Sequence, residues 1–221
     1  MPIEPPPTGH RLEGPVNRFA WHVKRAEKFA VAVMPSVQAQ GDPAIQQYLF
    51  QALVLMIHSH MEDFFTRVVS LGGITRPAEL RAHIAKHYPA EIVLAETEPI
   101  FKLADVAADR EVSFRDDAVR LKRVFRCLFD REPFADPGAE AECLDLVVVR
   151  NVITHDGAWP REGARDRVRR KDVILESGRV GDGTFYKLEI PVAFIVDTLS
   201  ALARSVRAFD EDLRKHPCFR I

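Results

Sequence analysis

Cysteine is scarce in this sequence, and the residues that are present lie far apart. Cys127, Cys143 and Cys218 form no CxxC pair. The sequence therefore carries neither the framework of a disulfide-stabilised secreted domain nor the paired thiolates of a structural zinc site. A reducing cytoplasm is the compartment that this usage of cysteine predicts.

Long apolar runs are missing as well. The richest apolar stretch, residues 48–57, is interrupted by Gln51 and followed by His, Glu and Asp, so it is too short and too polar to span a bilayer. The first residues lack an apolar segment behind positive charge, and we expect residues 1–14 to form a flexible arm rather than a secretory signal. The sequence thus predicts no membrane partner.

The charges show no excess of one sign. Lys and Arg number 31 and Asp and Glu 32, a formal net charge of −1, so any contact with nucleic acid must use a local basic patch. The sequence also lacks GxxxxGK[ST], the glycine fingerprint of dinucleotide-binding folds, and GxSxG. Their absence excludes common nucleotide-hydrolase and serine-hydrolase sites. No cofactor is expected.

Helical periodicity covers most of the chain. Hydrophobic residues make up 47% and charged residues 29%, which is a globular mixture. Pro35 should end the first helix, while Asp42 and Ser113 should cap the second and third of the long helices. We expect long helices at residues 15–33, 43–73, 113–130, 139–155 and 191–215, with two or three shorter ones between 76 and 102.

A different pattern precedes the last helix. The alternating segments VILE and TFYKLEI flank a turn that contains GDG, which predicts a small β-hairpin within about residues 172–192. The second helix is apolar around most of its circumference, as a central helix requires. The expected fold is mainly α, an up-and-down helical bundle with a long central helix and this hairpin, formed as a single domain over residues 15–217.

The segment LDLVVVRNVITHDG stands out, because an arginine and an asparagine interrupt an apolar helix and a histidine follows just before its end. Arg150, Asn151 and His155 form the pattern RNxxxH, which resembles the signature of the HEPN superfamily. At the level of pattern the resemblance extends over about residues 42–215. It includes the long second helix with its SHMEDFF stretch, the hairpin and the closing helix.

This resemblance implies a fold and a function. Many HEPN proteins are metal-independent ribonucleases that act as homodimers, with both motifs in one cleft, in toxin–antitoxin, abortive-infection and CRISPR-associated systems. By resemblance we expect RNA as the substrate, a second copy of the chain as a partner, and an antitoxin or regulatory protein as a further one. Other members have lost catalysis, so a non-catalytic module that binds RNA or protein is the alternative. A purely structural dimerisation protein is a third possibility.

The residues of the motif suit RNA cleavage on chemical grounds. RNA carries its own nucleophile, the 2′-hydroxyl, so cleavage needs a base, an acid and positive charge on the phosphate. An imidazole exchanges protons near neutral pH, and a guanidinium binds phosphate oxygens in pairs. We therefore expect His155 as the acid–base group, Arg150 as the phosphate ligand and Asn151 as the residue that positions His155.

The spacing of the motif leaves its geometry open. On a continuous helix Arg150 and His155 point about 140° apart. Three arrangements would bring the groups together. Either the helix loosens near Thr154, or the arginine side chain curls round, or the second motif of a dimer supplies the missing group. Alternatively, Arg150 forms an internal salt bridge and His155 closes the helix end as a favourable cation.

Two i,i+4 pairs that contain histidine lie outside the motif. His58 and Glu62 share an i,i+4 face of the long second helix, and either is a candidate to position the motif. One helix offers too few converging ligands and HExxH is absent, so no metal is expected. His83 and His87 have the same spacing, and we expect them on an exposed helical face.

A basic run, REGARDRVRRK, follows the motif. We expect it to form a loop that contacts phosphates, although Glu162 and Asp166 partly neutralise it. Its basic residues, the candidates for RNA binding, are Arg161, Arg165, Arg167, Arg169, Arg170 and Lys171.

Overall fold

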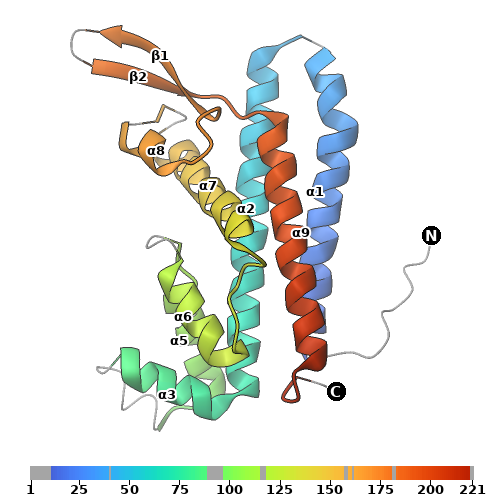
Figure 1. Ribbon diagram of the computed structural model, residues 1–221, viewed down its shortest axis with the longest axis vertical. Helices are drawn as coiled ribbons and strands as arrows, with labels where there is room; N and C mark the ends of the chain where they lie inside the picture. Colours follow the sequence, from blue (N-terminus) through green and yellow to red (C-terminus); the bar gives the residue numbers. More distant parts are fainter. Residues whose placement is uncertain are drawn as a thin grey trace. The chain divides into compact units, whose positions relative to one another are not determined.

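The chain is mainly helical, with a two-stranded antiparallel sheet before the last helix (Figure 1). This confirms the predicted fold class. The computed structural model describes residues 11–39, 41–88, 97–114, 118–156, 159–160, 162–180 and 183–219. Most of the predicted N-terminal arm therefore lies outside the described residues.

The elements follow one another in an order close to the expected one. The helices are α1 Glu13–Ala39, α2 Pro43–Thr75, α3 Pro77–His87, α5 Ile100–Glu111, α6 Val119–Phe129, α7 Pro137–His155, α8 Glu162–Arg167 and α9 Val192–Lys215. The strands are β1 Ile174–Val180 and β2 Gly183–Leu188. Over the described part of the chain, none of these helices combines the length and apolar character that a membrane span requires.

Contacts within the chain divide it into two compact units. Unit 1 comprises Met1–Phe19, Glu62–Pro133 and Val206–Ile221, and unit 2 comprises Ala20–Met61 and Phe134–Ser205. The boundary between them falls within α1, α2 and α9. A single domain over residues 15–217 stays a prediction.

Local signals explain where α2 begins. Asp42 caps it, because its Oδ1 accepts a hydrogen bond from the backbone N–H of Ala44 at 2.9 Å, and Pro43 occupies the first helical position. Pro35, by contrast, lies inside α1, and the prediction that it ends the helix is wrong. A proline inside a helix costs about 3 kcal/mol, because its N–H is missing and its ring clashes with the preceding turn, and the apolar residues buried along the preceding turns hold the helix despite this cost.

The start of α6 also differs from the prediction. The helix begins at Val119, after Ala118 in the left-handed conformation with φ of 59°, and Ser113 does not cap it. The backbone N–H of Ser113 instead donates to the carbonyl of Glu111 at 2.8 Å, in the turn that follows α5. Because an N-cap residue stands directly before the first helical residue, Ser113 is too far along the chain from Val119 to serve as the cap.

The core of unit 1 is aromatic. Its buried rings include Phe65 of α2, Phe125 and Phe129 of α6 and Phe209 of α9. The ring centroids of Phe65 and Phe125 lie 5.5 Å apart, and those of Phe129 and Phe209 lie 5.1 Å apart. Such edge and tilted contacts are the favoured arrangement of aromatic rings. Gly72 permits the packing, because a Cβ at this position would lie 2.4 Å from Phe129 Cζ.

Unit 1 also contains a buried ionic cluster. Glu111 Oε1 lies 2.7 Å from His83 Nε2 and 3.0 Å from Arg123 Nη2. Burial opposes ionisation of Glu111, but hydrogen bonds with His83 and Tyr88 and the charge of Arg123 outweigh it and lower the pKa of this carboxyl. His83 is therefore buried, and the predicted exposed face is wrong for this residue, because a carboxylate inside the unit satisfies its ring nitrogen.

In unit 2 the hairpin leads directly into α9 (Figure 1). Ile174 pairs with Leu188 and Arg179 with Thr184, with an irregularity between Glu176 and Gly178. The predicted hairpin is thus confirmed. Beyond β2, the backbone N–H of Ile190 donates to Gln47 Oε1 at 3.0 Å, which fixes the end of the hairpin to α2.

Candidate functional site

Helix α7 carries the motif on its last two turns. Asp136 caps the start of the helix, since its side chain accepts a hydrogen bond from the N–H of Ala139 at 2.7 Å. The helix ends at His155, as predicted, and the N–H of Asp156 still bonds to the carbonyl of Val152 at 3.0 Å. Its buried face consists of Ala139, Cys143, Asp145, Leu146, Val147, Val149 and Val152.

The motif side chains lie outside this buried face. Arg150 and Asn151 are half-buried, and Thr154 and His155 are exposed. Arg150 Nη1 donates a hydrogen bond to Asn151 Oδ1 at 2.9 Å. In this structure Asn151 therefore positions the guanidinium, whereas the sequence led us to expect it to position the imidazole.

The helix is intact through the motif. Thr154 Oγ1 donates to the backbone carbonyls of Arg150 at 3.0 Å and Asn151 at 3.3 Å, so the backbone does not loosen near Thr154. Asn151 and His155 stand in i,i+4 relation and share one side of the helix. The hydrogen bond to Asn151 turns the Arg150 side chain toward this side of the helix. Of the three arrangements considered above, this is the one in which the arginine side chain curls round.

The basic run after the motif contains a short helix, α8, where the sequence predicted a loop. Arg165 Cζ lies 5.3 Å from the centre of the Tyr186 ring, and Arg167 Nε donates to the carbonyl of Gly163 at 3.2 Å. Arg169 is exposed. Arg161 lies outside the described residues.

Two of the basic residues hold this segment together. Arg170 forms a two-point ion pair with Asp172 and a second ion pair with Asp197 of α9. Hydrogen bonds to Asp172 and then to Asp197 raise the pKa of Arg170 above its ordinary value, despite partial burial. Lys171 Nζ donates to the carbonyls of Arg165 at 2.8 Å and Val168 at 2.7 Å.

Asp145 links the motif helix to the basic run. It is 2% exposed, and its two carboxylate oxygens accept hydrogen bonds from the backbone N–H groups of Arg169 at 2.9 Å and Arg170 at 3.1 Å. No local sequence pattern indicates this role, because the two partners follow Asp145 by more than twenty residues. The basic segment is therefore held against α7 by a buried carboxylate.

Removal of this carboxylate should destabilise the protein. Asp145→Ala leaves two backbone N–H groups without an acceptor, at about 1–3 kcal/mol each, so we expect the free energy of unfolding to fall by about 2–6 kcal/mol. Asp145→Asn retains one acceptor and should lose less. Asp166→Ala, at an exposed position of α8, is the control and should change stability little. Urea unfolding checks the prediction, and equal stability of the two alanine variants would contradict it.

The two supporting candidates on α2 belong to different units. His58 is buried in unit 2, and Glu62 is half-buried in unit 1. The role of either residue in positioning the motif stays a prediction. Within the described ranges, no group of three or more His, Cys, Asp or Glu side chains is arranged to hold a metal ion.

An aromatic residue that the sequence reading missed lies close to the motif. Trp159 is 65% exposed, and its backbone N–H donates to the carbonyl of Asp156 at 3.0 Å. Its position is therefore tied to the residue that follows His155. Exposed aromatic rings are typical stacking platforms for unpaired bases.

Comparison with known proteins adds no relative. No protein-family model, curated protein or solved structure matches the chain. Function is therefore inferred from the chain's own residues and from the motif that they form.

Proposed function

We propose that this protein is a metal-independent endoribonuclease of the HEPN kind, with its site at the C-terminal end of α7. The observation that carries the proposal is the arrangement of the motif on an intact helix. His155 is exposed, and Asn151 holds the Arg150 guanidinium toward the side of the helix that His155 shares. An acid–base group and a phosphate ligand are thus presented together.

Two copies of this motif would supply the groups that cleavage by transesterification needs. His155 takes the proton of the 2′-hydroxyl, the 2′-oxygen attacks the adjacent phosphorus, and the bond from phosphorus to the 5′-oxygen breaks. Arg150 stabilises the negative charge that develops on the phosphoryl oxygens. The leaving 5′-oxygen takes up a proton, and we assign the His155 imidazole of a second copy as the donor of this proton. The products end in a 2′,3′-cyclic phosphate and a 5′-hydroxyl.

The basic run contributes unequally to the proposed RNA contacts. Arg170 and Lys171 hold the segment together, so we assign phosphate contacts first to Arg167 and Arg169, which are exposed. Arg161 and Arg165 remain candidates from the sequence. Trp159 would stack on an unpaired base beside the scissile phosphate, which favours single-stranded RNA.

The biological setting follows from the resemblance alone. We propose action in the cytoplasm, in a toxin–antitoxin or antiviral defence system, with an antitoxin or regulatory protein as a further partner. The alternative is a non-catalytic HEPN-like module that binds RNA or protein through the same helix end. Incubation of the purified protein with single-stranded RNA tests the proposal, since the alternative predicts binding without cleavage.

Variants of Arg150 and Asn151 should separate phosphate binding from proton transfer. Arg150→Ala should weaken RNA binding and cleavage, and it should reduce the salt dependence of affinity by about 0.7 in log–log slope for one lost phosphate contact on a single strand. Asn151→Ala releases the guanidinium and should have a smaller effect of the same kind. Binding curves at several salt concentrations measure both.

The pH profile of cleavage then identifies the partner of Asn151. If Asn151 positions Arg150, as the hydrogen bond indicates, Asn151→Ala should raise KM and leave the shape of the pH profile unchanged. A shifted profile with unchanged salt dependence would contradict this assignment and favour a role beside His155. Arg150→Lys, which keeps the charge but loses the two-point geometry, is the matched control.

We also expect a homodimer in which the two motif segments face each other. Light scattering at micromolar concentration should give twice the chain mass, and the interface should have at least the standard size of about 1,600 Å². Excess His155→Ala protein should suppress wild-type cleavage, because mixed dimers contain only one intact motif. A monomeric mass, or no suppression after subunit exchange, would contradict a shared site.

A further inference from the structure

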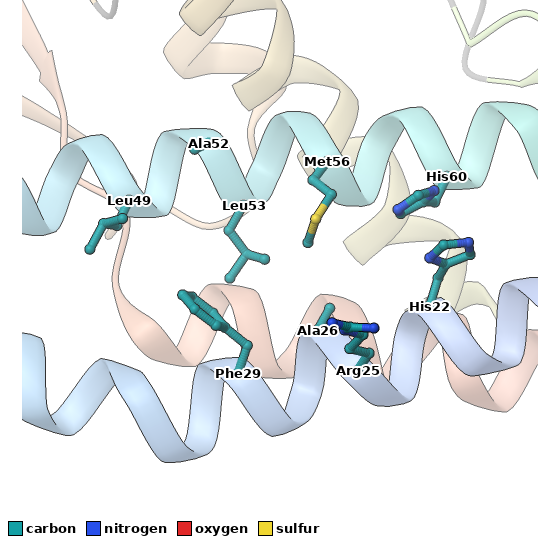
Figure 2. Close-up of a pocket in the computed structure, with 9 residues that line it drawn as sticks. All are labelled: His22, Arg25, Ala26, Phe29, Leu49, Ala52, Leu53, Met56 and His60. Carbon is teal, nitrogen blue, oxygen red and sulfur yellow. The ribbon is translucent and has the colours of Figure 1, made fainter.

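A groove runs between α1 and α2 within unit 2, and none of the RNxxxH motif residues lines it. Figure 2 shows its walls, with Phe29 on α1 and Leu49, Leu53 and Met56 on α2. Its volume is about 270 Å³. This is slightly below the range of about 300–1,000 Å³ that is usual for pockets that bind drug-sized molecules, so the groove suits a smaller ligand.

The walls of the groove are apolar and open to solvent. Leu53 is buried at its base, whereas Phe29 is 38% and Met56 41% exposed. Leu49, Leu53 and Met56 follow one another at spacings of four and three residues, so they form a continuous stripe along α2. An apolar chain laid along this stripe would remove these side chains from water.

One end of the groove is polar and positively charged. The rings of His22 and His60 stack with their centroids 3.7 Å apart, and Arg25 lies beside them in Figure 2. An imidazole ring carries N–H groups that can donate hydrogen bonds, and a guanidinium carries five. These donors come from both helices and meet at the same end.

The surrounding charges favour an anion at this end. Residues 20–39 of α1 contain Lys24, Arg25 and Lys28 against Glu27 alone, and residues 43–61 of α2 contain no Asp, Glu, Lys or Arg. Two acidic residues, at positions 62 and 63, follow directly on α2, and the second of them is neutralised by an ion pair with Arg67. A carboxylate or similar monoanion would therefore meet complementary charge. A cation in the same place would meet repulsion.

We infer that the groove binds a free amphipathic monoanion, with its apolar chain along Leu49, Leu53 and Met56 and its acidic headgroup at His22, Arg25 and His60. The twelve residues from Leu49 to His60 span about 16 Å of helix, and the volume holds roughly nine water-sized groups, so a chain of roughly eight to twelve carbon atoms fits. This inference does not depend on the ribonuclease proposal.

Calorimetry with matched amphiphiles tests the ligand class. Decanoate below its micelle concentration should bind with one-to-one stoichiometry. It should bind about 4–16-fold more tightly than octanoate, because each buried methylene strengthens binding about two- to four-fold. Decanol and decyltrimethylammonium have the same chain without the anion and should bind at least ten-fold more weakly. Equal affinity for all three ten-carbon probes would overturn the assignment of the polar end.

Variants locate the site and provide internal controls. Arg25→Gln should weaken decanoate binding at least five-fold, while Lys24→Gln, on the same helix but outside the groove, should not. Met56→Glu should abolish binding, and Ile45→Glu, at a 57% exposed position of α2 outside the groove, should preserve it. Circular dichroism verifies that each variant folds.

Other occupants of the groove give distinct results. Binding to anionic vesicles without saturable binding of monomeric decanoate would identify a membrane surface and overturn the inference. A change from dimer to monomer caused by Met56→Glu, but not by Ile45→Glu, would show that a second copy covers the groove, and would overturn it as well. Loss of ribonuclease activity is not a readout here, so the two proposals fail independently.

Discussion

Replacement of His155 by alanine should reduce RNA cleavage by about 10²–10⁴-fold, the usual contribution of a general acid or base. The side chain is exposed at the end of α7, so its loss should leave the fold intact. As a cation near a helix C-terminus the imidazole contributes at most about 1 kcal/mol to stability. Single-turnover cleavage of a labelled single-stranded RNA measures the rate, and thermal melts measure the stability.

Thr154→Ala provides the matched control for this variant. Thr154 is the neighbouring exposed residue, and its hydroxyl bonds only to backbone carbonyls of its own helix, so cleavage should remain close to wild type. Free imidazole in the buffer should restore part of the activity of His155→Ala, because it replaces the missing proton carrier. Cleavage at the wild-type rate, or a melting temperature far below wild type, would favour the structural interpretation of the motif.

The non-catalytic alternative makes a different prediction for the same proteins. His155→Ala and wild type should then bind RNA equally, and neither should cleave it. Affinity that falls steeply with salt would still indicate phosphate contacts from the basic run. A protein that binds no RNA at any salt concentration would leave only a structural or protein-binding role.

Elements of the fold that rest on neighbouring residues could be predicted from the sequence. The start of α2 follows from Asp42 and Pro43, and the hairpin follows from alternating side chains around a turn. Errors arose where packing outweighs a local signal. Pro35 lies within α1, and Ser113 serves the turn after α5 instead of capping α6.

In the candidate site, too, local patterns could be predicted and remote partners could not. Arg150, Asn151 and His155 were identified because polar side chains interrupt an apolar helix. Asp145 interrupts the same helix but is a buried acceptor for backbone N–H groups more than twenty residues later. Only the three-dimensional partners distinguish the two cases. The burial of His83 likewise depends on a remote partner, because Glu111 is far from it in sequence.

A single 2′-deoxy substitution at the scissile nucleotide should reduce cleavage to background, since the proposed reaction uses the 2′-hydroxyl of the substrate as its nucleophile. The chain's own contribution is limited to the imidazole of His155 and the guanidinium of Arg150, and neither requires a metal ion for its role. We therefore expect EDTA to leave the rate unchanged. Mass spectrometry of the 5′ fragment should show a 2′,3′-cyclic phosphate.

The position of the deoxy nucleotide provides the control for this experiment. A 2′-deoxy group one nucleotide away removes no nucleophile, so cleavage at the original bond should continue at a similar rate. Binding of the substituted strand should match that of RNA if Arg150 and the basic run contact mainly phosphates. Cleavage at the deoxy position, or loss of activity in EDTA that added Mg²⁺ restores, would require a water nucleophile or a metal ion, and the mechanism assigned to His155 and Arg150 would be wrong.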